Sequence, residues 1–173
     1  MLPILAPVVG TLVGAFVGSA AIQALYESFI DEFPTYDDPA VGEPKRGSVL
    51  WCHMYNLSHT GIYVGGGKII HLTGKTNDKP CTIDGTHNLD SFSDGWKIYV
   101  SCKGKNPVGS ERAARHAEKC EGQKRQYNLL EHNCHGFVVE CLTGVEQSEV
   151  RARKPAKETA EHTGMDCWRR WER

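Results

Sequence analysis

The stretch HTGIYVGGGKIIHL, residues 59–72, decides the fold that we expect. Residues 60–65 and 68–72 are rich in β-branched and aromatic side chains, and three consecutive glycines at their junction supply a tight turn. We therefore expect a β-hairpin in which His59 opens the first strand and His71 closes the second. The two imidazole rings then lie near one another on the same edge of the sheet.

The sequence around this hairpin predicts further strands and two helices. Ser110 is placed to cap a helix over residues 111–120, with Gly122 as its stop. A second helix starts near Asn133 and ends at Gly144, because its apolar residues have helical spacing. The other expected segments are strands at residues 48–54 and 96–102 and a loop at residues 73–95. Together they predict an α+β fold with an antiparallel sheet.

Cys134 lies in the first turn of the second predicted helix, in the run NCHGF. A cysteine attacks a carbonyl carbon as its thiolate, and both a helix N-terminus and a neighbouring imidazolium lower the pKa of a thiol. We predict that Cys134 is a catalytic nucleophile, with His59 as its base and His71 as the residue that orients His59. A buried, inert core cysteine is the alternative interpretation.

The overall composition argues against a nucleic-acid partner and a disulfide scaffold. Twenty Lys and Arg stand against 21 Asp and Glu, so the net charge is -1 and there is no basic surplus. The seven cysteines are an odd number without paired spacing. Reduced thiols are expected, which slightly favours the cytoplasmic face of a membrane, although one or two bridges in an oxidising compartment stay open as an alternative.

Residues 1–26 carry no charged side chain, and most of this stretch is strongly apolar. Gly10, Gly14 and Gly18 recur every fourth residue, as in helices that pack closely inside membranes. We expect a membrane segment that also allows self-association through these glycines. A buried core helix, an amphipathic packing arm and a secretory signal are the alternatives, and the missing positive charges before the apolar run disfavour the last.

Four regions follow from these patterns. We expect an apolar glycine-zipper helix at residues 1–32, a linker at 33–47, a catalytic domain at 48–146 and a charged C-terminal tail at 147–173. The tail is interpreted as a solvated segment or as a packed terminal helix, and its Trp and Arg cluster at residues 168–171 leaves contact with an anionic membrane surface as an alternative.

No metal or cofactor is expected from the motifs. Cys52-His53 and the histidines at positions 132 and 135 lack the paired spacings of zinc ligands. The three glycines form a turn and not a phosphate loop, because no Lys-Ser or Lys-Thr follows them.

Two ordered boxes carry a family resemblance. The stretch 59–72, followed by YNLL at 127–130 and by Asn133-Cys134, resembles the lecithin:retinol acyltransferase-like family, a circularly permuted branch of the NlpC-type, papain-like fold. The resemblance implies that Cys134 forms an acyl thioester, with His59 and His71 as its partners, and that the substrate is a lipid. The residues after the thiol, His135-Gly136, depart from the Glu-His of the family.

Three functions follow as hypotheses. The first is a membrane-associated thiol acyltransferase or acyl hydrolase of the phospholipase type that acts on lipid esters. The second is an NlpC-type amidase or endopeptidase, because CHGF also resembles the CSGF of peptidoglycan hydrolases. The third is a non-catalytic membrane adaptor or pore-forming protein that depends on the glycine zipper.

Overall fold

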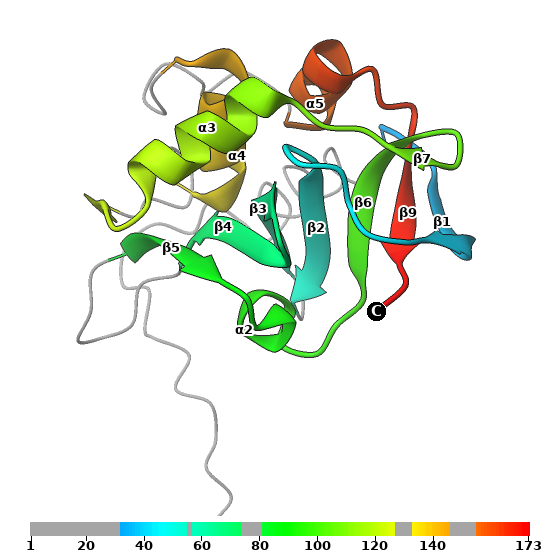
Figure 1. Cartoon of the computed structure of the whole chain (residues 1–173), viewed down its shortest axis with the longest axis horizontal. Coiled ribbons are helices and arrows are strands. Elements are labelled where there is room, and N and C mark those ends of the chain that lie inside the picture. The colour runs from blue at the N-terminus through cyan, green and yellow to red at the C-terminus, as the bar shows by residue number, and fades with distance from the viewer. Residues whose placement is uncertain (1–31, 55–56, 74–80, 127–132, 146–154) are drawn as a thin grey trace, which may run out of the picture.

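A curved sheet with helices on both faces forms the folded unit (Figure 1). The computed structural model describes residues 32–54, 57–73, 81–126, 133–145 and 155–173. The strands are β1 (Thr35–Val41), β2 (Val49–Met54), β3 (Leu57–Gly65), β4 (Lys68–Leu72), β5 (Cys81–Thr86), β6 (Ile98–Lys103), β7 (Asn106–Pro107), β8 (Lys124–Arg125) and β9 (Cys167–Trp171). The helices are α2 (Leu89–Ser93), α3 (Glu111–Cys120), α4 (Cys134–Thr143) and α5 (Pro155–Thr163).

The strands of the sheet follow the order β1-β9-β6-β2-β3-β4-β5-β8, with β7 paired to β6. The contacts between β6, β2, β3, β4 and β5 are antiparallel, as expected. At one edge, however, β1 runs parallel to β9, so the sheet is mixed and not purely antiparallel. The α+β class that the sequence predicted is confirmed.

The predicted hairpin is β3–β4, and its turn depends on glycine. Gly65, Gly66 and Gly67 have φ values of 96°, 59° and 74°, a region that L side chains rarely adopt. Ile62 pairs with Ile70 and Tyr63 with Ile69 across the hairpin. This register fixes the relative positions of the histidines near the two strand ends.

The two predicted helices begin and end close to where their capping residues lie. The Ser110 side chain accepts from the Ala113 N–H at the start of α3. The Asn133 side chain accepts from the Gly136 N–H at 2.9 Å at the start of α4, and Gly144 ends α4 with a φ of 77°. Both caps satisfy backbone groups that a helix end leaves unpaired.

Apolar side chains cover both faces of the sheet and form two cores. On one face, Trp51 and Ile62 of the sheet pack with residues of α3, α4 and α5, among them Phe137. On the other face, Leu50 and Tyr63 belong to a second core with Phe92 of α2 and other strand residues. Successive residues of β2 and β3 thus contribute to opposite cores, as the alternation of a strand requires.

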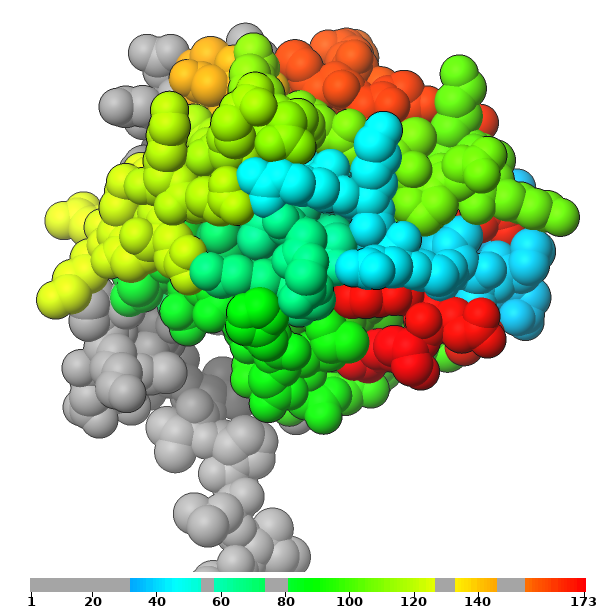
Figure 2. Space-filling model, in the orientation of Figure 1, coloured from blue at the N-terminus to red at the C-terminus, as the bar shows by residue number. Residues whose placement is uncertain are grey.

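Three segments differ from their sequence predictions. The expected linker at 33–47 contains β1, and the expected loop at 73–95 contains β5 and α2. The expected C-terminal tail at 147–173 contains α5 and β9. Figure 2 shows the C-terminal residues, in red, against the blue and cyan residues of the β1 region.

The buried Trp168 side chain and an arginine hold β9, the C-terminal strand, in the sheet. Trp168 is fully buried between its neighbours in the sheet, where it packs edge-on to Trp51 with ring centroids 6.2 Å apart. Arg169 donates to the Gly104 and Pro39 carbonyl oxygens, and its guanidinium lies 4.6 Å from the centroid of the Tyr36 ring. The charged residues that suggested a solvated tail therefore tie β9 to the sheet.

Among the described residues, no helix has the length and apolar character needed to cross a membrane. The apolar stretch 1–26, with Gly10, Gly14 and Gly18, lies outside them. Its predicted membrane role and self-association stay predictions.

Candidate active site

Cys134 is the first residue of α4, as its place in the sequence predicted. Asn133 before it has an extended backbone and caps the helix, so the thiol projects from the first turn. The side chain is buried, with 7% of its surface exposed. Its Sγ donates to the Ser58 carbonyl oxygen of β3 at 3.9 Å.

His59 and His71 meet across the β3–β4 hairpin. His59 Nε2 and His71 Nδ1 are 2.7 Å apart, and the two rings lie edge to face with centroids 4.9 Å apart. Phe92 of α2 packs against both rings, at 5.0 Å from His59 and 5.4 Å from His71. The prediction that the hairpin brings the two rings together is confirmed.

The thiol lies beside the strand residues on either side of His59. Ser58 accepts its hydrogen bond, and Thr60 lies close enough to stabilise its thiolate form by hydrogen bonding. Cys52, which is paired with His59 across β2 and β3, is an electrostatic neighbour of Cys134. Because directly paired residues share one face of a sheet, Cys52 and His59 project from the same face of β2 and β3. No hydrogen bond joins Cys134 Sγ to the ring of His59 or His71.

His135 links the helix that carries the thiol to the strand that carries His59. Its Nε2 lies 2.9 Å from Ser58 Oγ, and its Nδ1 lies 3.1 Å from Thr60 Oγ1. The two hydroxyl groups flank His59 in the sequence, so one imidazole ring spans the strand on both sides of the proposed base. The sequence pointed to His135 as a neighbour of the thiol but did not single out Ser58, Thr60 or Phe92.

Comparison with known proteins places this geometry in a family. The family model described as lecithin retinol acyltransferase matches residues 42–147, which is more than half of the chain. The chain belongs to the lecithin retinol acyltransferase family. The human protein "Phospholipase A and acyltransferase 2" is 22% identical over 121 residues, which cover 61% of this chain and 75% of that protein.

In this member of the lecithin retinol acyltransferase family, burial keeps the thiol protonated. Desolvation raises the pKa of Cys134 above its usual value of 9.0. Hydrogen bonds from Thr60 and from the backbone N–H groups at the start of α4 oppose this shift without cancelling it. The helix N-terminus and the neighbouring imidazoles favour a thiolate, as we expected, but the desolvation of a buried charge outweighs them.

Burial also keeps His59 and His71 neutral. Burial lowers the pKa of His59 well below 6.5, and His71 and His135 lower it further. Burial also lowers the pKa of His71 to about 4, although the nearby Asp84 carboxylate opposes the shift. A neutral imidazole beside a neutral thiol can accept a proton when the sulfur attacks.

The hydroxyl group of Tyr63 has its hydrogen-bond partners within and next to the β3–β4 hairpin. Tyr63 is buried, donates from its hydroxyl group to the Glu43 carboxylate and accepts from the Gly67 N–H at 2.9 Å. It therefore supports the turn of the hairpin. His132, which the sequence places two residues before the thiol, lies outside the described residues.

Proposed function

We propose that this protein is a cysteine-dependent acyltransferase or acyl hydrolase that acts on lipid esters through a thioester on Cys134. The observation that carries the proposal is that Cys134, a buried thiol at a helix start, contacts Ser58, and that the next residue, His59, is hydrogen-bonded to His71. Family membership supports the reaction class, and the name of the human relative supports a phospholipid substrate for the same kind of site.

The first half of the proposed reaction acylates the thiol. Because His71 holds Nε2 of His59, Nδ1 of His59 is the ring nitrogen that accepts the Cys134 proton. The sulfur attacks the ester carbonyl carbon and a carbon–sulfur bond forms. The bond from that carbon to the alcohol oxygen then breaks, and protonated His59 gives its proton to the leaving alcohol.

The second half transfers the acyl group. Water, an alcohol or an amine attacks the thioester carbon while His59 accepts its proton. The carbon–sulfur bond breaks, and the proton returns from His59 to the Cys134 sulfur. The products are a fatty acid, a new ester or an amide, according to the acceptor, and the enzyme regains its neutral thiol.

The start of α4 can stabilise the charge that develops on the carbonyl oxygen. The Gly136 N–H donates to the side-chain oxygen of Asn133 at 2.9 Å, and the Phe137 N–H donates to the backbone oxygen of Asn133 at 3.1 Å. The N–H groups of Cys134 and His135 instead face the thiol. We propose the Cys134 N–H as the first oxyanion donor, since a backbone donor at a helix start is already oriented before the reaction.

The same proposal includes a circularly permuted papain-like fold and a role for residues 1–26 at a membrane. The order His59, His71, Cys134 and the position of the thiol at a helix start fit a circularly permuted papain-like domain. Residues 1–26 would hold the active site at a lipid surface, where a water-insoluble ester is available.

Intact mass measurement tests the acyl-enzyme step. The full chain is incubated with phosphatidylcholine vesicles and quenched in acid, and its mass is compared with that of Cys134→Ala. We expect the wild-type mass to increase by one acyl group and Cys134→Ala to stay unchanged. Cys141→Ala is the matched control, because Cys141 is a buried cysteine of the same helix, and it should be acylated like wild type.

His135-Gly136 favours an amide substrate as the second candidate, since this pair departs from the family pattern. Peptidoglycan fragments and isopeptide-linked peptides are offered to the same three proteins. Cys134-dependent cleavage of these amides without lipid acylation would replace the lipid proposal. Biological activity that survives Cys134→Ala would instead support the non-catalytic hypothesis.

A further inference from the structure

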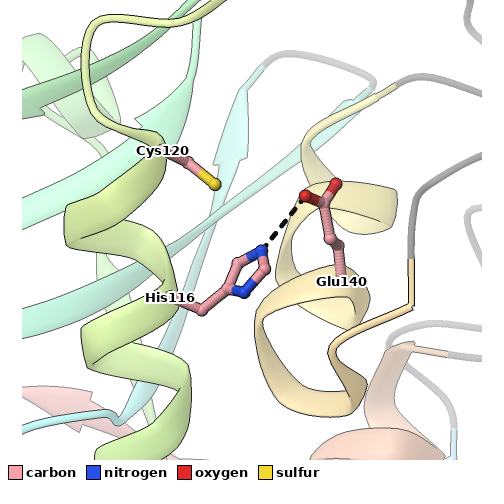
Figure 3. Close-up of side chains that lie close together, drawn as sticks. All are labelled: His116, Cys120 and Glu140. Atoms are coloured by element: carbon pink, nitrogen blue, oxygen red, sulfur yellow. Dashed lines mark hydrogen bonds and ion pairs between the residues drawn. The ribbon is translucent and has the colours of Figure 1, made fainter.

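A second cluster of chemically reactive side chains lies between α3 and α4, on residues that the proposed reaction does not use. His116 and Cys120 are four residues apart on α3, so they share one face of that helix. Glu140 of α4 points toward them from the opposite side (Figure 3). One ring nitrogen of His116, the sulfur of Cys120 and one carboxylate oxygen of Glu140 all lie within 4.8 Å of one another.

We propose that His116, Cys120 and Glu140 bind a divalent transition metal ion, for which Zn²⁺ is the best chemical match. Imidazole, thiolate and carboxylate are the three kinds of side chain that bind Zn²⁺ in proteins. Ca²⁺ and Mg²⁺ prefer sites made of oxygen atoms alone, so a thiol among three donors disfavours them. Three protein ligands leave the fourth tetrahedral position for water.

The Glu140 carboxylate provides an independent reason for a cation at this place. Its side chain is only 5% exposed, and Oε1 accepts from His116 Nε2 at 3.1 Å. The other oxygen, Oε2, is buried and has no hydrogen-bond partner among the described residues. A buried carboxylate oxygen without a partner is costly, and a metal ion bound to Oε2 would remove that cost.

Arg125 carries a positive charge beside the cluster, but it contacts the other carboxylate oxygen. Its Nη2 donates to Glu140 Oε1 at 3.1 Å and lies 3.9 Å from Cys120 Sγ. A metal ligand is commonly oriented by such a second partner, which leaves the remaining oxygen for the ion. On binding, the Cys120 S–H bond breaks, a sulfur–metal bond forms and the proton goes to solvent.

Binding of the ion through Oε2 requires the side chains of the cluster to rearrange. In tetrahedral coordination with bonds of about 2.0–2.3 Å, the ligand atoms lie roughly 3.3–3.8 Å apart. The His116 ring must therefore turn away from Oε1, and its side chain, 29% exposed, has space to do so. The bound ion would join α3 to α4, the helix that begins with Cys134. The proposal does not depend on the reaction of that thiol.

Metal titration of the full chain tests this proposal. The protein is treated with a chelator, exchanged into chelator-free buffer and titrated with Co²⁺ alone, while the thiolate-to-cobalt absorption band is followed; Zn²⁺ then displaces the cobalt. We expect one equivalent to bind and the band to be lost in Cys120→Ser. His116→Ala and Glu140→Gln should weaken binding by at least about tenfold.

Matched controls separate this site from the other histidines and thiols. His162→Ala removes a half-exposed histidine near a glutamate of α5, and Cys167→Ser removes a buried thiol far along the chain; both should bind cobalt like wild type. Circular dichroism checks that each variant is folded, and Zn²⁺ should raise the melting temperature of wild type but not of His116→Ala. The proposal is wrong if no one-to-one binding saturates, if His116→Ala binds like wild type, or if Cys134→Ala abolishes the cobalt band.

Discussion

His59 Nε2 lies 2.7 Å from His71 Nδ1, so His71 of β4 holds the imidazole ring of His59 of β3 in place. In the proposed mechanism this contact leaves Nδ1 of His59 for the thiol. His71 is then a positioning residue whose removal weakens the reaction without removing the base.

Replacing His71 tests this role. We expect His71→Ala to lower kcat/KM by about 10- to 100-fold, because the His59 ring loses the contact that orients it. His71→Asn should retain more activity than His71→Ala, since its side-chain amide reaches the region that Nδ1 occupies. The rates are measured with a soluble short-chain ester, and His87→Ala is the control. Equal rates for His71→Ala and wild type would refute the role.

The protonation state of the Cys134 thiol predicts its reactivity toward alkylating agents. Burial raises the pKa of Cys134 above 9.0, so the reactive thiolate accumulates only in alkaline solution. Iodoacetamide labelling of the Cys134 peptide, followed by mass spectrometry, should still accelerate above pH 9. A labelling rate that levels off near pH 7 would show that the thiol is already ionised in the resting protein.

Acid should destabilise the folded state through the buried histidines. Burial lowers the pKa of His71 and of His135 to about 4, from 6.5 in an exposed histidine. Between these values the unfolded chain binds protons that the folded chain does not. The stabilising contribution of the neutral histidines is therefore fully present above about pH 6.5. Below that pH the free energy of unfolding falls toward pH 4, by up to ~1.4 kcal/mol per pH unit for each histidine.

Urea unfolding at several pH values measures this slope. His71→Gln should show a shallower decrease than wild type, because one buried titrating group is gone. His87→Gln removes an exposed histidine and should leave the slope unchanged. A pH-independent free energy of unfolding between pH 7 and pH 5 would contradict the expectation.

The bridge from His135 to β3 can be measured by a double-mutant cycle. His135→Ala and Thr60→Val each break the contact between His135 Nδ1 and Thr60 Oγ1, which is 3.1 Å long. We expect a coupling of about 0.5–1.5 kcal/mol in the free energy of unfolding, the usual net contribution of a hydrogen bond. A coupling of zero would show that the two side chains do not interact in solution.

The C-terminal strand should be essential for stability. Trp168 is fully buried, so Trp168→Ala leaves a large cavity and should cost about 3–5 kcal/mol in urea unfolding. Trp96, whose side chain is 44% exposed, provides the control, and its replacement by alanine should change stability by about 0.5 kcal/mol or less. Similar losses for both variants would argue against β9 as part of the core.

Local sequence signals predicted the parts of the fold that depend on neighbouring residues. The β3–β4 turn needs three glycines with positive φ, and the caps Asn133 and Ser110 satisfy helix ends within three residues of themselves. The contact between His59 and His71 follows from the hairpin alone. These features could be predicted because the sequence that forms them is contiguous.

Features that depend on distant residues could not be predicted in the same way. Thr35 pairs with Trp168, and the charged run that contains β9 has no alternating pattern that marks a strand. The pKa of Cys134 depends on how much protein surrounds it, which the helix-start motif does not reveal. Glu140 lies 20 or more residues from its α3 neighbours, so short metal-binding spacings did not indicate the cluster, and we expected no metal.

His135 contacts β3 on both sides of His59, and this has a consequence for how new substrates can be acquired. The proposed nucleophile and the proposed base are carried by one helix and one strand, and the His135 ring joins the two elements. Loops around the site can therefore be exchanged, lengthened or shortened without changing the distance between the reacting groups. The contact that holds α4 to β3 is thus separate from the loops that would meet a substrate.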